Sequence, residues 1–125
     1  SALGITEEDY ESNINFKYVT NLKELKEIIK SSQKPILIDF WASWCVNCKE
    51  LESNVLTQSD VAKKLNEFIL IKIDLSQSSP ENEELMREYQ IYGPPVLLIY
   101  NNGELKSQIT GLISPNELLQ RLNQI

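Results

Sequence analysis

The chain has 125 residues, of which 42% are hydrophobic, and its 18 acidic residues outnumber 12 basic ones to give a formal charge of −6. This size and composition are typical of one compact domain, and a negative chain without a block of Lys or Arg is a poor match for nucleic acid. No apolar run approaches the ~20 residues that span a bilayer, and the absence of histidine excludes every mechanism that needs an imidazole as base, acid or metal ligand.

The N-terminal part of the chain begins with a polar, acidic segment and then alternates between strand and helix patterns. We expect residues 1–15 to be a linker or N-terminal arm and residues 16–125 to form one domain. A short strand over 15–19 is followed by a helix over 21–31, where apolar residues recur at helical spacing. The nearly continuous apolar run 35–41 predicts a central strand buried on both faces.

The remaining elements continue this alternation and end in a hairpin and a helix. We predict helices over about 45–55 and 57–65, with Thr57 to Asp60 as cap residues, then a strand over 68–74 and a helix from Ser79 to about Tyr89. Strands over 96–100 and 105–110 flank an Asn-Asn-Gly-Glu turn, and Ser114 caps a last helix. Early crossovers imply parallel pairing and the hairpin is antiparallel, so the order predicts an α/β fold with a mixed sheet covered by helices.

The two cysteines, Cys45 and Cys48, lie three residues apart, where a disulfide closes too small a loop to add much stability. Redox chemistry explains the pair better than architecture does. Cys45 is predicted at the first turn of a helix, where free N–H groups and the helix dipole favour a thiolate, so it is the expected nucleophile. Cys48 follows one turn later on the same face and is the expected resolving thiol.

Two other interpretations of this pair are half of a zinc site and two unrelated buried cysteines. A tetrahedral zinc site needs about four ligands, and this chain has neither a histidine nor a second cysteine pair to complete one. Neither interpretation explains the preceding strand, the following helix or the flanking Trp41 and Trp44. We therefore expect no metal and no organic cofactor, only a redox-active disulfide between Cys45 and Cys48.

Two acidic residues are candidates for tuning the dithiol. Asp39 interrupts an apolar strand, where burial raises the pKa of a carboxyl group, and it could exchange a proton with Cys48. Glu52 comes seven residues after Cys45, which on a regular helix brings it to within about 20° of the same face. Together they would make Cys45 less reactive until a partner docks. Alternatively, Asp39 is a capping or turn-bonding acid and Glu52 a solvated helix residue.

The segment Asp39–Lys49, followed later by Pro95 before an apolar strand, resembles the thioredoxin superfamily over about 16–124 in element order. Within it, the motif Trp-Cys-Val-x-Cys-Lys-Glu-x-Glu at 44–52 resembles the C-terminal domain of DsbD thiol:disulfide interchange proteins. General thioredoxins instead carry Gly-Pro between the cysteines. The resemblance implies a thioredoxin fold in which Cys45 attacks, Cys48 resolves, and Asp39 and Glu52 tune both thiols.

The resemblance also implies a substrate-contacting surface. Pro95 matches the superfamily's cis-proline, whose neighbouring backbone pairs with the incoming chain. We expect Trp44, Pro94 and Pro95 to contact the substrate. The sequence departs from the usual pattern at Pro94, which has no N–H to donate, and at Val96, where threonine is common.

The DsbD resemblance implies a monomeric domain in the periplasm, tethered to the inner membrane through its parent protein. It would take electrons from a transmembrane domain and pass them to an N-terminal periplasmic domain, which reduces disulfide isomerases and cytochrome c maturation factors. A start at Ser1 without methionine fits a piece of such a protein, with the targeting signal upstream. Two alternatives stay open: a general thioredoxin-like disulfide reductase, and a non-catalytic thioredoxin-like binding module in which the cysteines are incidental.

Overall fold

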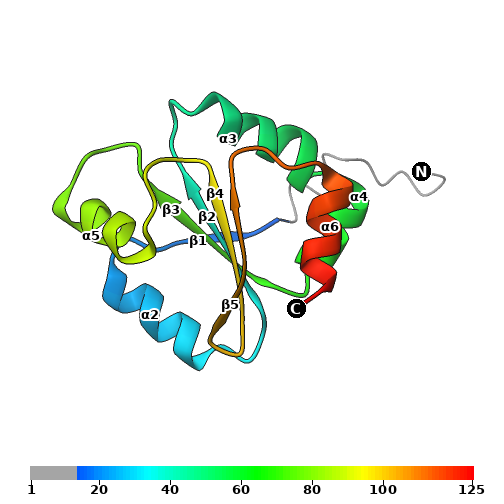
Figure 1. The fold of residues 1–125 in the computed structure, drawn as a ribbon, viewed down its shortest axis with the longest axis horizontal. Coiled ribbons are helices and arrows are strands. Elements are labelled where there is room, and N and C mark those ends of the chain that lie inside the picture. Colours follow the sequence, from blue (N-terminus) through cyan, green and yellow to red (C-terminus); the bar gives the residue numbers. More distant parts are fainter. Residues whose placement is uncertain (1–13) are drawn as a thin grey trace.

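A five-stranded mixed sheet lies at the centre of the computed structural model, which describes residues 14–125 (Figure 1). The predicted linker or arm over 1–15 therefore lies outside the described residues except for its last two positions. Ile14, the first described residue, packs against the hydrophobic core together with Phe16. The described domain thus begins with residues that are already docked.

The order of strands in the sheet is β1-β3-β2-β4-β5. β3 pairs in parallel with both β1 and β2, whereas β4 is antiparallel to β2 and to β5, which confirms the predicted mixed sheet. The tight turn between the last two strands uses Asn102 and Gly103, both at positive φ, as expected for a two-residue hairpin. The strands span β1 (Phe16–Tyr18), β2 (Ile36–Trp41), β3 (Ile69–Asp74), β4 (Val96–Asn101) and β5 (Glu104–Thr110).

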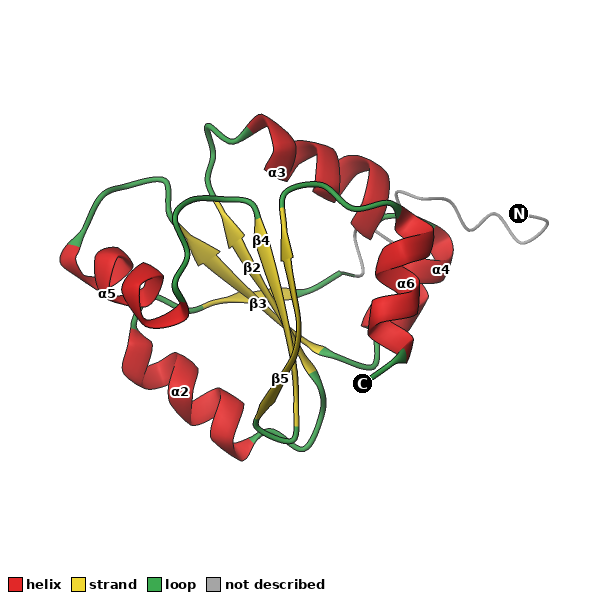
Figure 2. Cartoon of the chain, viewed as in Figure 1, coloured by secondary structure: helices red, strands yellow, loops and turns green. Residues whose placement is uncertain are grey.

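Helices cover both faces of the sheet, as Figure 2 shows. One face packs against α2 (Leu22–Ser31) and α5 (Pro80–Tyr89), and the other against α3 (Val46–Leu51), α4 (Ser59–Leu65) and α6 (Pro115–Asn123). Two separate apolar clusters result, one on each face. Within residues 14–125, no helix combines the length and the apolar character that crossing a membrane requires.

The central strand β2 contributes side chains to both apolar clusters in strict alternation. Ile36, Ile38 and Phe40 belong to the cluster under α2 and α5, whereas Leu37 belongs to the cluster under α3, α4 and α6. Successive strand residues point to opposite faces of a sheet. Asp39 therefore faces the same side as Leu37, beneath the helices that follow the cysteines.

The caps of two helices form as predicted, and those of a third do not. The Ser79 hydroxyl accepts from the Asn82 N–H at 3.0 Å and the Ser114 hydroxyl from the Glu117 N–H at 3.2 Å, each with a proline in the first turn. The cap predicted within Thr57 to Asp60 is wrong, because α4 starts after Gln58 without a side-chain cap bond. The Thr57 hydroxyl instead donates backwards to a carbonyl of the preceding helical turn.

The helix that carries the cysteines differs from the regular α-helix predicted over 45–55. α3 ends at Leu51, and a π-helical turn, η1 (Glu52–Leu56), continues it. A π turn inserts one extra residue per turn, so it rotates every later side chain relative to a regular helix. Glu52 itself keeps the α-helical bond from its N–H to the Cys48 carbonyl, so the π turn rotates the side chains after Glu52, and the angular estimate that places Glu52 near the Cys45 face stays a prediction.

The alternation of faces predicts a large difference between two leucines in paired strands. Replacing fully buried Leu97 of β4 by alanine leaves a cavity and should lower the free energy of unfolding by about 2–5 kcal/mol. Leu105→Ala in β5, where the side chain is 47% exposed, should change it by less than about 1 kcal/mol. Urea unfolding followed by circular dichroism measures both, and equal losses would contradict the described burial.

Candidate functional site

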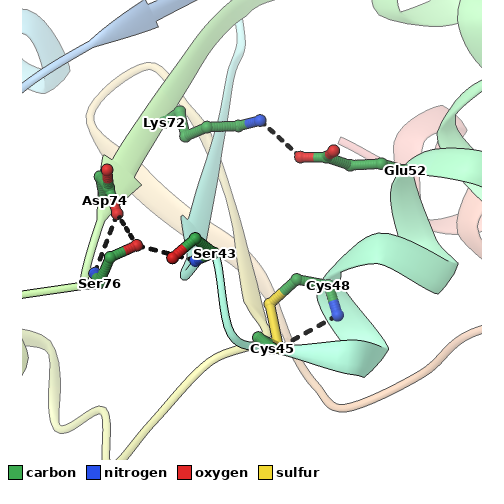
Figure 3. Close-up of a disulfide and its surroundings, with 7 residues drawn as sticks. All are labelled: Ser43, Cys45, Cys48, Glu52, Lys72, Asp74 and Ser76. Carbon is green, nitrogen blue, oxygen red and sulfur yellow. Dashed lines mark hydrogen bonds and ion pairs between the residues drawn. A yellow bond between two sulfur atoms is a disulfide. The ribbon is translucent and has the colours of Figure 1, made fainter.

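Cys45 and Cys48 form a disulfide at the start of α3, with Cα atoms 5.3 Å apart (Figure 3). Cys45 is the N-cap residue, and its Sγ accepts the backbone N–H of Cys48 at 3.1 Å. This donor lies where a thiolate on Cys45 would need stabilising once the disulfide is reduced. Cys45 is 6% exposed and Cys48 only 2%, so a molecule approaching from solvent meets Cys45 first.

The position of the disulfide follows from how β2 ends. β2 stops at Trp41, and the Cys45 N–H donates to the Ala42 carbonyl at 3.2 Å to close the loop into the helix. Ala42, Cys45 and Cys48 form a small buried cluster of their own, against which Trp41 packs. The two cysteines thus lie at the end of β2, between the buried core and solvent.

Three charged residues meet on the face of the sheet that α3 and η1 cover. Asp39 of β2 is only 3% exposed and stands beside Lys72 of β3 in the parallel register, and Lys72 is 7% exposed. The Lys72 ammonium forms an ion pair with the Glu52 carboxylate at 2.5 Å. Lys72 is therefore paired with one carboxylate, on the helix, and is the strand neighbour of the other, in the sheet.

Burial dominates the electrostatics of Asp39. It raises the pKa of this carboxyl to about 7, although the positive charge of Lys72 acts to lower the pKa; the negative charge of Glu52 adds to the increase. The sequence-based expectation of a raised pKa for Asp39 is thus matched by its environment. Such a group can accept and release a proton near neutral pH.

Lys72 is the residue that the sequence interpretation missed. Its Nζ lies 4.8 Å from the ring centroid of Phe16, 5.0 Å from that of Trp41 and 5.9 Å from that of Tyr18, so aromatic faces surround the cation. A signal was available: Lys72 interrupts an apolar strand just as Asp39 interrupts another. What was missing was the register that makes them neighbours.

Glu52 is aimed at Lys72 rather than at the sulfur atoms. Figure 3 shows its side chain extending toward Lys72, with the disulfide lower in the view and not in its path. A direct role of Glu52 beside Cys45, like the tuning role of Asp39, stays a prediction.

Two of the predicted substrate-contacting residues, Trp44 and Pro94, line a cavity of about 290 Å³, and Pro95 does not. Trp44, which is 63% exposed, forms one wall, and Tyr92, Gly93 and Pro94 form another. The Pro94–Pro95 peptide bond is cis, and Pro95 is buried, with its carbonyl accepting from the backbone N–H of the residue after β5. The structure thus brings Trp44 and Pro94 together at one surface.

The described residues do not form the ligand set that a metal ion needs. Across residues 14–125, no group of three or more Cys, Asp or Glu side chains is arranged to hold a metal ion. The disulfide occupies both sulfur atoms that such a site would use.

Known sequences similar to this chain include thioredoxin-like and DsbD proteins. A family model described as a thioredoxin-like domain matches residues 22–125. The chain is 38% identical to a DsbD thiol:disulfide interchange protein of Campylobacter jejuni over 109 residues, which are 87% of this chain and 19% of that protein. It is 36% identical to the Actinobacillus pleuropneumoniae protein of the same name over 118 residues, 91% of this chain and 20% of that protein. The chain thus spans about a fifth of the length of these relatives.

Comparison with solved structures agrees. The oxidised C-terminal domain of DsbD from Neisseria meningitidis superposes with a TM-score of 0.72 at 25% identity, covering 86% of this chain and 98% of that one. Mitochondrial thioredoxin 3 of Saccharomyces cerevisiae gives 0.69 at 23% identity, covering 93% and 99%, and shows the fold alone. The predicted thioredoxin fold and the DsbD resemblance are confirmed, with Cys45 and Cys48 in the C-x-x-C position.

The raised pKa of Asp39 predicts how stability depends on pH. The folded chain holds this proton up to a pKa of about 7, whereas the unfolded chain loses it near its ordinary pKa of about 4. The free energy of unfolding should therefore fall as pH rises from about 4 to 7, at up to about 1.4 kcal/mol per pH unit from this group, and level off above. Asp39→Asn should remove that slope in urea titrations of the oxidised protein. The exposed-site control Asp60→Asn should keep it.

The charge cluster predicts opposite pKa changes for two substitutions. Lys72→Met removes the charge that lowers the Asp39 pKa and should raise it, whereas Glu52→Gln removes a charge that raises it and should lower it. Titration of the ¹³C-labelled Asp39 carboxyl by NMR in the oxidised protein measures both. Shifts of the Asp39 pKa in the same direction would contradict these opposite charge effects of Lys72 and Glu52.

Proposed function

The chain belongs to the thioredoxin-like domain family, and we propose that it relays electrons by dithiol–disulfide exchange, from a membrane-embedded domain to a periplasmic partner domain. The observation that carries this proposal is the Cys45–Cys48 disulfide at the start of α3, a helix that covers the sheet face bearing the buried carboxyl group of Asp39. The DsbD relatives are named thiol:disulfide interchange proteins, which supports disulfide exchange as the reaction.

The exchange uses the two sulfur atoms in sequence. In the reduced domain, the Cys45 thiolate attacks one sulfur of a partner disulfide, the partner's S–S bond breaks, and its other sulfur leaves as a thiolate. The Cys48 thiolate then attacks Cys45 Sγ, which restores the internal disulfide and releases the second partner thiol. Two electrons have passed to the partner, and a reduced donor returns the domain to its dithiol form by the reverse steps.

The order of attack is supported by position. Cys45 has the larger exposed fraction, lies at the helix N-cap, and receives the Cys48 N–H. A Cys45 thiolate is therefore stabilised where a partner can reach it. Cys48 is covered and reacts from inside, which suits a thiol whose task is to resolve the mixed disulfide.

Asp39 supplies a proton acceptor for this second step. Cys48 must lose its proton before it attacks, and a carboxyl group with a pKa of about 7 can take that proton near neutral pH. Asp39 faces the side of the sheet on which the cysteine helix packs. Lys72 lies beside it to offset the carboxylate charge once the proton has left.

The electron donor and the electron acceptor of the proposed relay would both be domains of one parent protein. Because the chain spans about a fifth of its DsbD relatives, we place it in a larger membrane protein. There it would be a monomeric periplasmic domain that reaches the membrane only through its tether. A transmembrane domain would donate electrons and an N-terminal periplasmic domain would accept them, with roles in cytochrome c biogenesis downstream. The redox-active disulfide carries the electrons without an organic cofactor or metal.

Trapping of a mixed disulfide tests the proposal. Cys48→Ala should accumulate a covalent complex with an oxidised partner through Cys45, because nothing remains to resolve it. Non-reducing gel electrophoresis detects the complex, and the matched variant Cys45→Ala should trap none. No complex with Cys48→Ala under either reducing or oxidising conditions would favour the non-catalytic binding module.

A second measurement separates the relay from a general thioredoxin-like reductase. Rapid turnover with a cytoplasmic thioredoxin reductase and insulin would favour the general reductase. Exchange that is much faster with the parent protein's own membrane and N-terminal domains is the expected result for the relay.

A further inference from the structure

The loop after β3 is tied to the loop that carries Trp44 by a chain of hydrogen bonds centred on Ser76 (Figure 3). The Ser76 hydroxyl donates to Asp74 Oδ1 at 2.5 Å and accepts the backbone N–H of Ser43 at 2.8 Å. The Ser76 N–H also donates to Asp74 Oδ1 at 2.9 Å. The indole N–H of Trp44 donates to the Ser76 carbonyl at 3.3 Å.

Asp74 determines the direction of these bonds. A hydroxyl has one proton to donate, and the nearby carboxylate accepts it, so an oxygen lone pair stays available for the Ser43 N–H. The Asp74 carboxylate makes these two bonds to Ser76 and is otherwise exposed. Asp74 thus acts through Ser76 rather than on the cysteines.

The loop itself is anchored on the other side. The Asn82 side-chain amide, from α5, donates to the Asp74 carbonyl at 3.1 Å and to the Gln77 carbonyl at 2.8 Å. The Leu75 N–H donates to the Trp41 carbonyl at 2.7 Å. The hydrogen bonds therefore run without a break from α5 through the loop after β3 to the residues just before Cys45.

These contacts shape the surface beside Cys45. Trp44 and Ser76 both line the 290 Å³ cavity, opposite Tyr92 and Pro94. Trp44 is 63% exposed, so the apolar core does little to hold its ring. Its bond to the Ser76 carbonyl is what remains to orient the indole.

We propose that Ser76, oriented by Asp74, is a positioning residue that holds Trp44 as a wall of the partner-binding surface beside Cys45. The proposal rests on the proposed function, because it concerns how a protein partner is received there. Ser76 does not touch the sulfur atoms and takes no part in the bond exchange. Its loss should therefore slow reactions with large disulfide substrates and leave those with small ones nearly unchanged.

The first test reads Trp44 directly and needs no activity. The chain has two tryptophans, so an NMR spectrum of the oxidised protein shows two indole N–H signals, which a Trp44→Phe spectrum assigns. In Ser76→Ala the Trp44 indole N–H should exchange with solvent several-fold faster, because the N–H of Ser43, the residue before Trp44, loses its hydroxyl acceptor and this segment is released from the loop after β3. The Trp41 signal serves as internal reference. Unchanged Trp44 exchange in Ser76→Ala would overturn the proposal.

The second test compares two disulfide substrates. The rate constant for reduction of insulin should fall about 3- to 10-fold in Ser76→Ala, the loss expected for one hydrogen bond. The rate constant with 5,5′-dithiobis(2-nitrobenzoate), a small disulfide, should stay within about 2-fold. Ser76→Thr keeps a hydroxyl and should restore the insulin rate. Equal falls with both substrates would overturn the proposal, because Ser76 would then act on the sulfur chemistry or the fold.

Two further variants complete the design. Ser59→Ala removes an exposed serine hydroxyl at the start of α4 and should change neither rate. Asp74→Ala should reproduce Ser76→Ala, and the double variant should be no slower than either, because the two residues act as one unit. Asp74→Ala also takes the place of Ser76→Ala in both tests if the Ser76→Ala variant does not fold. If the wild type reduces neither substrate, the proposed function fails, while the NMR test still decides the positioning of Trp44.

Discussion

The ion pair between Lys72 and Glu52, with Asp39 beside it, is the interaction around which this site is arranged. Buried charges are costly unless they are paired, and removing one partner leaves another stranded. The parallel register of β2 and β3 sets Asp39 against Lys72, and η1 brings Glu52 down onto the same cation. One lysine thereby neighbours two acids, Asp39 in the sheet and Glu52 at the end of the helix that carries the dithiol.

The topology of the sheet brings the remaining parts of the site together. β2 and β3 are parallel, so their carboxyl ends meet at one edge, and antiparallel β4 begins at that same edge. The loops carrying Trp44, Ser76 and Pro94 therefore converge there, although they lie far apart in the sequence. The dithiol sits at the same end of the sheet, near the Asp39, Lys72 and Glu52 charges and the cavity that Trp44 and Pro94 line.

Much of the fold follows from local patterns that the chain carries in short segments. Apolar runs predict the strands, Ser79 and Ser114 with their prolines predict two helix starts, and an Asn-Gly turn predicts the hairpin. The π turn at Glu52 was not predictable in this way, because the helical period assumes one hydrogen-bond register throughout. The ion-pair partner of Glu52 was not predictable either, because Lys72 belongs to another element.

The sequence by itself determined the nature of the chemistry: two cysteines one turn apart after a buried strand, no histidine, and an acid inside an apolar run. These are properties of neighbouring residues, and helix and strand geometry translates them directly into position. Only the tertiary structure decided the partners of that chemistry, namely Lys72 for the two acids and Ser76 for the Trp44 loop. Both depend on which strands lie side by side and in what register, and that is settled when the whole sheet packs rather than by any one segment.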